Sequence, residues 1–281
     1  MRVRLRVTGT VQGVGFRPFV YRHAVALGLS GSVCNDSGGV LIEAEGPALQ
    51  ISELQRLLTD QPPPLARVDA VVAQPLPLVD ETGFLIVESV DDGASDVPVS
   101  VDTATCDDCL TELFDPANRR HRYPFVNCTN CGPRYTIVRS VPYDRPATTM
   151  AGFTMCAACQ REYDDPADRR FHAQPNACPA CGPRVRLVAG DGIQVAVDDD
   201  AVQATVAVLR DGKIVALKGL GGFHLAVDAG NDVAVAELRR RKVRDDKPFA
   251  VMARDLAEAQ RLCRLDADAA AALVSPRRPI V

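Results

Sequence analysis

Residues 7–17 read VTGTVQGVGFR and lead from an alternating strand pattern, through a glycine-dense turn, into a helical pattern. Successive backbone amides in such a turn converge and can bind an anion, and the positive end of the following helix strengthens the attraction. Arg17, at the start of the helix, can add a bidentate guanidinium contact to a phosphate. The alternative is a tight turn whose glycines only adopt positive φ angles. The turn by itself leaves both interpretations open.

Residues 1–90 show the patterns of a small α/β domain around this turn. The expected elements follow the order βαββαβ, which predicts a ferredoxin-like sandwich. The strands are expected at Arg2–Thr8, Ser30–Asn35, Val40–Glu45, Arg67–Ala73 and Gly83–Glu88, and the helices at Arg17–Leu27 and Pro47–Leu58. Polar, Asp-rich residues 91–105 follow and predict a linker.

The motif VxGxVQGVxFR in residues 7–17 resembles the signature of acylphosphatases, and so do residues 31–35 (GSVCN) and 38–40 (GGV). This resemblance covers residues 1–90 and implies a phosphate site and a catalytic pair. The phosphoryl group would be bound by Gln12, Gly13, Val14, Gly15, Phe16 and Arg17, and Asn35 would hold the attacking water. A neutral amide suits that role because it orients a water without repelling a dianionic substrate.

Eight of the ten cysteines form four CxxC pairs within a repeat whose two copies start 50 positions apart. Each copy has two pairs separated by 18 residues, which is the spacing of a Cys₄ zinc shell. The predicted ligands are Cys106, Cys109, Cys128 and Cys131 in residues 106–134, and Cys156, Cys159, Cys178 and Cys181 in residues 156–184. We therefore expect two zinc ribbons with one structural zinc ion each. Pairing within a repeat is the simplest arrangement, and crosswise pairing stays open.

Other cysteine and histidine roles are less favoured. Disulfides are disfavoured because the N-terminal MRVRLRVTGT lacks the features of a secretion signal, and the cytosol is the expected compartment. Four Cys already complete each shell, so His121 and His172 are expected to cap or pack. Cys34 and Cys263 are expected to be buried and unpaired. No apolar run reaches the roughly 20 residues that a membrane span needs.

Residues 200–281 show a second α/β pattern, after a linker expected at Val188–Asp200. The expected helices are Ala201–Arg210, Asn231–Val243 and Asp255–Leu262, and the expected strands are Ile214–Leu217, Phe223–Val227 and Pro248–Met252. The sequence stops at a strand-like Pro279–Val281, before such a domain could close, so we expect a truncated domain. All four lysines lie in this region. Polyphosphate binding is one interpretation of its basic residues, and a solvated helix face is the other. The candidates are Lys218, Lys242, Arg244 and Lys247.

The whole chain resembles the HypF-type carbamoyltransferases of NiFe-hydrogenase maturation. The acylphosphatase signature, the duplicated CxxC module, KGLGGFHLAVDA (residues 218–229) and RRRKVRDDKPFAVM (residues 239–252) occur in that order. The resemblance implies a multidomain α+β and α/β protein ending in part of a YrdC-like nucleotide-binding domain. It also implies release of carbamate from carbamoyl phosphate, formation of carbamoyl adenylate from ATP (with Mg²⁺), and transfer to the C-terminal cysteine of a HypE-type maturation protein by a further domain. We expect this chain to be an N-terminal portion of such an enzyme.

Two other functions are considered beside this resemblance. A stand-alone acylphosphatase with zinc ribbons would hydrolyse acyl phosphates without ATP. A zinc-dependent RNA-binding module would use the arginines around the CxxC pairs, and its binding would depend steeply on salt. The net charge of −4 and the aspartates interspersed among those arginines argue against it. We therefore expect neither nucleic acid nor a membrane as partner.

Overall fold

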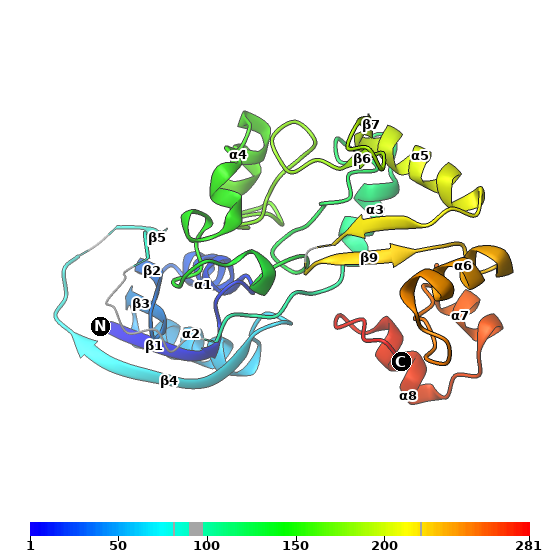
Figure 1. Ribbon diagram of the computed structural model, residues 1–281. Coiled ribbons are helices and arrows are strands. Elements are labelled where there is room, and N and C mark those ends of the chain that lie inside the picture. Colours follow the sequence, from blue (N-terminus) through cyan, green and yellow to red (C-terminus); the bar gives the residue numbers. More distant parts are fainter. Residues whose placement is uncertain (81, 90–97, 220) are drawn as a thin grey trace. The chain divides into compact units, whose positions relative to one another are not determined.

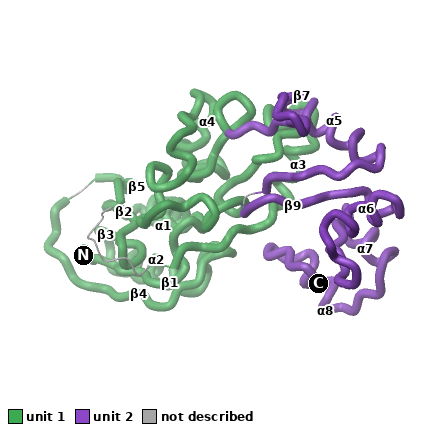
Figure 2. Tube along the Cα trace, viewed as in Figure 1, with its two compact units in different colours: residues 1–182 green, residues 183–281 purple. Residues whose placement is uncertain are grey.

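The structure is a computed structural model that describes residues 1–80, 82–89, 98–219 and 221–281. The chain divides into two compact units, Met1–Gly182 and Pro183–Val281 (Figure 2). Residues 91–97 of the expected linker and Leu220 of the glycine-rich turn lie outside the described residues. No helix within the described ranges is long and apolar enough to cross a membrane.

The first unit begins with a five-stranded sheet in the order β4-β1-β3-β2-β5, and helices α1 and α2 pack on it (Figure 1). The strands are β1 Arg2–Thr10, β2 Ser30–Asp36, β3 Gly39–Glu45, β4 Arg67–Leu76 and β5 Phe84–Ile86, and the helices are α1 Phe16–Ala26 and α2 Ala48–Asp60. Neighbouring strands are antiparallel, except that β5 runs parallel to β2. The predicted ferredoxin-like sandwich is confirmed.

The alternation along β1 explains the two faces of this sheet. Val3, Leu5 and Val7 are buried in the core under the helices. The intervening arginines lie on the opposite face, where Arg2 and Arg4 both donate to the carboxylate of Glu43 on β3. The hydrophobic face therefore anchors the strand whose far end leads into the glycine-dense turn.

The rest of the first unit holds the duplicated cysteine module, with a connecting segment between its two copies (Figure 1). Each copy begins with a short helix directly after its first cysteine. The elements are α3 Asp107–Phe114, the 3₁₀ turns η1 Tyr135–Ile137, η2 Arg145–Ala147 and η3 Thr149–Gly152, and α4 Ala157–Asp164.

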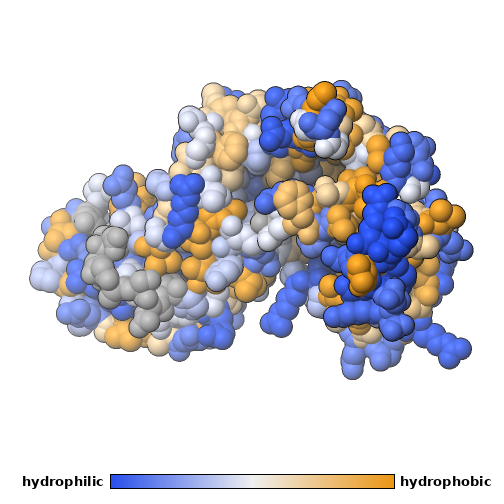
Figure 3. All heavy atoms as spheres, viewed as in Figure 1, coloured by the Kyte–Doolittle hydropathy of each residue, from blue (hydrophilic) through white to orange (hydrophobic). Residues whose placement is uncertain are grey.

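The second unit contains two β-hairpins and four helices in its described residues. These elements are β6 Arg186–Val188, β7 Gln194–Val197, α5 Asp198–Arg210, β8 Val215–Lys218, β9 Phe223–Ala226, α6 Asp232–Lys242, α7 Leu256–Leu262 and α8 Ala267–Val274. Strand β6 pairs with β7, and β8 pairs with β9. Many apolar side chains of this unit are exposed, including Phe223 and Met252. The space-filling view shows apolar patches among polar ones on the surface of the chain (Figure 3).

Several local predictions for the second unit are wrong. The expected linker Val188–Asp200 instead contains the turn of the first hairpin and β7, because Asp191 accepts the amide of Ile193 and Gly192 adopts a positive φ. Pro248–Met252 forms no strand, since the carbonyl of Pro248 accepts from the Arg244 side chain, not from a neighbouring strand. Residues 279–281 form no strand either. Cys263 is exposed, whereas Cys34 is buried as expected.

Candidate active site

The glycine-dense turn joins β1 to α1 and points the first residues of the helix toward β2. Gly13 and Gly15 have φ angles of 72° and 76°, which any residue with a Cβ atom adopts at a cost. Gly15 is the residue that precedes α1, so Arg17 lies in its first turn. The turn therefore places the Arg17 guanidinium and the amino end of the helix at the same position.

Gln12 fixes this turn to the β2–β3 hairpin. Its Nε2 donates to the carbonyls of Asp36 and Gly39, at 2.7 and 2.8 Å. Its Oε1 accepts the backbone amide of Tyr143, at 2.9 Å. The conformation of the turn is thus set by a buried side chain that belongs to it, and the same side chain attaches the connecting segment of the cysteine module.

Arg17 and Asn35, the predicted catalytic pair, are brought together. Both are largely buried, with 7% of Arg17 and 1% of Asn35 exposed. Both donate to the same atom, the carbonyl oxygen of Tyr143, at 3.4 Å from Arg17 Nη2 and 3.3 Å from Asn35 Nδ2. The Oδ1 of Asn35 is buried and has no hydrogen-bond partner among the described residues.

The cysteine module covers this site. The carboxylate of Asp144 lies 2.7 Å from Arg17 Nη2 and also accepts the hydroxyl of Ser89. Arg134 donates to the carbonyl of Gly13, and a Cβ atom on Gly13 would lie 3.3 Å from the Tyr143 ring. A cavity of about 20 Å³ remains between the turn and the module. That volume accommodates about one water molecule.

His172 packs against aromatic rings, as expected, and it also lines the same cavity. Its backbone has a positive φ of 52°, and its ring lies 4.7 Å from the ring of Phe171. Burial, followed by the positive charge of Arg17, lowers the pKa of His172 to about 4. The imidazole is therefore neutral near pH 7, and it adds no positive charge to the site.

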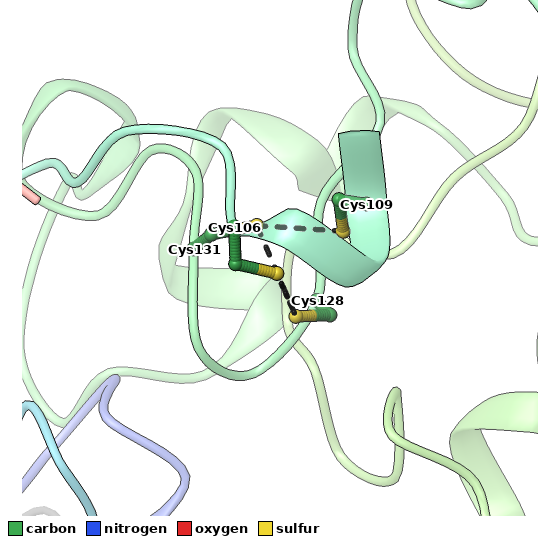
Figure 4. A group of neighbouring side chains, drawn as sticks. All are labelled: Cys106, Cys109, Cys128 and Cys131. Carbon is green, nitrogen blue, oxygen red and sulfur yellow. Dashed lines mark hydrogen bonds between the residues drawn. The ribbon is translucent and has the colours of Figure 1, made fainter. Parts of the chain in front are cut away.

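The predicted zinc ligands form two separate groups, one within each repeat, and each group has its four sulfur atoms within 4.8 Å of one another. In the first group the shortest separations are 3.7 Å for Cys106–Cys128, 3.8 Å for Cys128–Cys131 and 3.4 Å for Cys109–Cys131 (Figure 4). Zn–S bonds of about 2.3 Å give a tetrahedron with S–S edges of about 3.8 Å. The donor sets thus fit a zinc ion each.

The two repeats contact each other's cysteines through arginines. Arg119 of the first repeat donates to Sγ of Cys159 in the second, at 3.3 Å, and Arg169 of the second donates to Sγ of Cys109 in the first, at 3.1 Å. The neighbouring arginines of each repeat pair with a glutamate of the other repeat, Arg120 with Glu162 and Arg170 with Glu112.

These contacts engage several of the arginines that an RNA-binding surface would use. Arg120 and Arg170 are only 1% and 2% exposed, and Arg134 is buried against the glycine-dense turn. Arg184 pairs with Asp198. Arg120 and Arg170 therefore link the two repeats, whereas Arg134 binds the glycine-dense turn and Arg184 pairs within the second unit.

The predicted nucleotide-binding residues lie at the ends of elements in the second unit. Lys218 ends β8, with its ammonium 4.9 Å from the centre of the Phe223 ring, and Lys242 ends α6. Arg244 donates to the backbone carbonyls of Lys247 and Pro248, so it shapes the loop after α6. Nucleotide binding by these four residues stays a prediction.

Sequence reasoning missed the part of the site that the cysteine module supplies. Tyr143 and Asp144 lie in the segment between the two repeats, which has no counterpart within either repeat. They are more than 100 positions from Arg17, and no local motif links such distant residues. The packing role expected for His172 is confirmed, but its position in the cavity beside Arg17 was not predicted.

Comparison with known proteins agrees with this architecture. Three family models match: Acylphosphatase over residues 3–86, HypF finger over residues 105–138 and 155–188, and Telomere recombination (the Sua5–YciO–YrdC group) over residues 207–281. A protein named Acylphosphatase from Caldivirga maquilingensis is 47% identical over 89 residues, which is 93% of its length and 31% of this chain. The fold and the site thus define a chain with an acylphosphatase domain joined to a duplicated finger and a YrdC-like region.

Longer relatives match the chain from end to end. Carbamoyltransferase HypF2 of Cupriavidus necator is 57% identical, with 100% of this chain and 35% of the relative covered, and Carbamoyltransferase HypF of Rhizobium leguminosarum bv. viciae is 54% identical with the same coverage. A structure described as full-length HypF in the phosphate- and nucleotide-bound form superposes with a TM-score of 0.90 at 47% identity, over 98% of this chain and 36% of that one. The chain belongs to the HypF-type carbamoyltransferases, as an N-terminal portion, and spans about a third of the length of these relatives.

Proposed function

We propose that the first unit hydrolyses an acyl phosphate, and that its substrate is carbamoyl phosphate. The observation that supports this most is the convergence of Arg17 and Asn35 on one oxygen atom beside the glycine-dense turn. A cation and a neutral amide that reach the same oxygen can bind a phosphoryl oxygen and orient a water next to it. The relatives named carbamoyltransferase indicate which acyl group is used.

The residues present can carry out the hydrolysis by positioning and charge. The amides of residues 12–16 and the Arg17 guanidinium would bind the phosphoryl oxygens and stabilise the charge that develops on them. Asn35 would hold the attacking water through its unpartnered Oδ1. The water oxygen attacks phosphorus, the bond from phosphorus to the carbamoyl oxygen breaks, and phosphate and carbamate leave.

The role of the complete protein is also a proposal. Carbamate would be joined to ATP, with Mg²⁺, as carbamoyl adenylate in the YrdC-like domain, and a further domain would transfer the carbamoyl group to the C-terminal cysteine of a HypE-type protein. Lys218, Lys242, Arg244 and Lys247 are the proposed nucleotide contacts in this chain. The two Cys₄ groups would each hold a structural zinc ion, whose chemistry is to fix the fold of a finger. The cytosolic location stays a prediction.

Phosphate release from carbamoyl phosphate tests the hydrolytic site. We expect Arg17→Ala to lower kcat/KM by about 10²–10³, because it removes a contact that stabilises developing charge. Arg22→Ala is the matched control, since Arg22 is exposed on the same helix. Equal rates for Arg17→Ala and the parent chain would refute the assignment.

ATP separates the proposal from a stand-alone acylphosphatase. In both cases this chain releases phosphate without ATP, but only a carbamoyltransferase couples carbamate to AMP. The full-length protein should therefore exchange labelled pyrophosphate into ATP when carbamoyl phosphate is present. A full-length protein that hydrolyses carbamoyl phosphate without such exchange would support the alternative.

A further inference from the structure

Asp144 presents a carboxylate to the guanidinium that the phosphoryl group needs. Its Oδ1 lies 2.7 Å from Arg17 Nη2, and its other oxygen accepts the hydroxyl of Ser89. The Arg17 side chain is 8% exposed and that of Asp144 is 26% exposed. This ion pair is therefore largely shielded from the solvent that weakens surface pairs.

The backbone on either side of this carboxylate is fixed. The Tyr143 amide donates to Gln12, and the Tyr143 carbonyl accepts from both Arg17 and Asn35. After Asp144, the amide and guanidinium of Arg145 bind the side chain and carbonyl of Gln174. Because the cavity holds only about one water, an entering phosphoryl group must displace the Tyr143 carbonyl and the Asp144 carboxylate from Arg17. The bonds to Gln12 and Gln174 would still tie the segment, and Asp144 with it, to the site.

The acyl end of the substrate must lie on the side of the cysteine module. The cavity is lined by the turn and Arg17 and, from the cysteine module, by Tyr143, His172 and Gln174, and Asp144 adjoins this lining through its contact with Arg17. The acyl group, bonded to the phosphoryl oxygen, projects away from the turn. It therefore approaches the displaced carboxylate of Asp144.

A carboxylate that has lost its arginine keeps the Ser89 hydroxyl on one oxygen, and its other oxygen can accept a new donor. The carbamoyl group has an NH₂ that can donate, whereas the acetyl group of the same shape ends in a methyl that cannot. Without a donor, the carboxylate would face an apolar group next to a phosphoryl dianion. A carboxylate oxygen without a donor raises the free energy of the complex, and this penalty disfavours the ligand that lacks the NH₂.

We propose, on the basis of the proposed function, that Asp144 selects a carbamoyl group over other acyl groups. Its carboxylate would give up its contact with Arg17 and accept a hydrogen bond from the NH₂ of the substrate. The acylphosphatase domain alone does not contain this device. The Caldivirga acylphosphatase is matched over 93% of its length by 89 residues of this chain, so it has no room for a counterpart of the fingers and their connecting segment.

The test compares carbamoyl phosphate with acetyl phosphate, which differ only in NH₂ against CH₃ at the acyl group. In the parent chain kcat/KM should favour carbamoyl phosphate by at least about tenfold, since a site built to bind an N–H rejects the analogue that lacks it. Asp144→Ala should reduce that ratio to near one, and Asp144→Asn, which keeps an acceptor oxygen, should retain part of it. Asp69→Ala is the matched control, because Asp69 is an exposed aspartate that pairs with Arg67 and not with Arg17.

The outcomes separate this proposal from the proposed function. If Asp144→Ala raises or lowers both rates equally, Asp144 only occupies or orients Arg17, and the selectivity role is refuted while hydrolysis stands. If Arg17→Ala has no effect, the hydrolytic function itself fails. Should the chain turn over neither compound, the affinities for the two, measured by calorimetry, replace the rates, and equal affinities in the parent chain refute the proposal. Bound zinc and circular dichroism verify that each variant is folded.

Discussion

At the scale of single residues, the protonation state of a side chain in the site is set by its burial and by neighbouring charges. His172 is the clearest case, because burial next to Arg17 lowers the pKa of its imidazole to about 4. The unfolded chain binds a proton at this residue near pH 6.5, and the folded chain does not until much lower pH. The neutral imidazole therefore makes its full contribution to the free energy of unfolding above pH 6.5. That contribution is lost as the pH falls toward 4.

We predict that this linkage is removed by His172→Asn, since asparagine accepts the positive φ at this position. When the pH is lowered from 7 to 5, the free energy of unfolding of the parent chain should fall by about 2 kcal/mol more than that of the variant, because of His172. Denaturant titrations at the two pH values, with zinc present in both, measure the difference. Protonation of the cysteines affects both proteins alike, so parallel losses would contradict the prediction.

At the scale of elements, the two fingers are linked by arginines that reach across to the other finger's sulfur atoms. The donors to the proposed metal-binding sulfur atoms come from the opposite repeat, Arg169 to Cys109 and Arg119 to Cys159. Such contacts to metal ligands typically contribute 10- to 100-fold to metal affinity. A substitution in one finger should therefore act on the zinc site of the other.

Arg169→Ala should accelerate zinc release from the first group, Cys106, Cys109, Cys128 and Cys131, although Arg169 belongs to the second repeat. Arg119→Ala should do the converse. The two variants are controls for each other, and zinc release is followed with a chromogenic chelator, with each group identified by alkylation of its freed cysteines and mass spectrometry. Zinc lost from the substituted repeat itself would contradict the prediction.

At the scale of the whole molecule, the sequence shows what each region is but not how regions meet within the first unit. The alternation of β1, the hairpin turn at Gly38–Gly39 and the CxxC spacing are local patterns, so the sandwich and both Cys₄ groups were predictable. The contact of Asp144 with Arg17 joins residues 127 positions apart. It depends on packing between the fingers and the sandwich, and no hydrophobic periodicity or motif spacing in the sequence encodes such packing. The mistaken strand at Pro248–Met252 has a related cause, because an apolar run does not specify its hydrogen-bond partners.

Through that packing, the proposed zinc ions should influence the proposed hydrolytic site, although the cysteines themselves form no hydrogen bond with the predicted phosphate contacts among the described residues. The segment with Tyr143 and Asp144 connects the two fingers and is bonded to the glycine-dense turn through Gln12, while Arg134 of the first finger is bonded to Gly13. Structural zinc sites contribute folding free energy, so their removal should loosen this segment first. The sandwich has its own core of buried side chains and should remain folded.

We therefore predict that chelation of zinc leaves hydrolysis of acyl phosphates but lowers the preference for carbamoyl over acetyl phosphate by about tenfold, to the level of Asp144→Ala. Hydrogen exchange should show the physical cause, with protection lost in residues 135–150 while the strands of the sandwich keep theirs. Readdition of zinc should restore both the preference and the protection. A chelated protein that retains full preference while residues 135–150 exchange freely would show that selectivity resides in the sandwich alone.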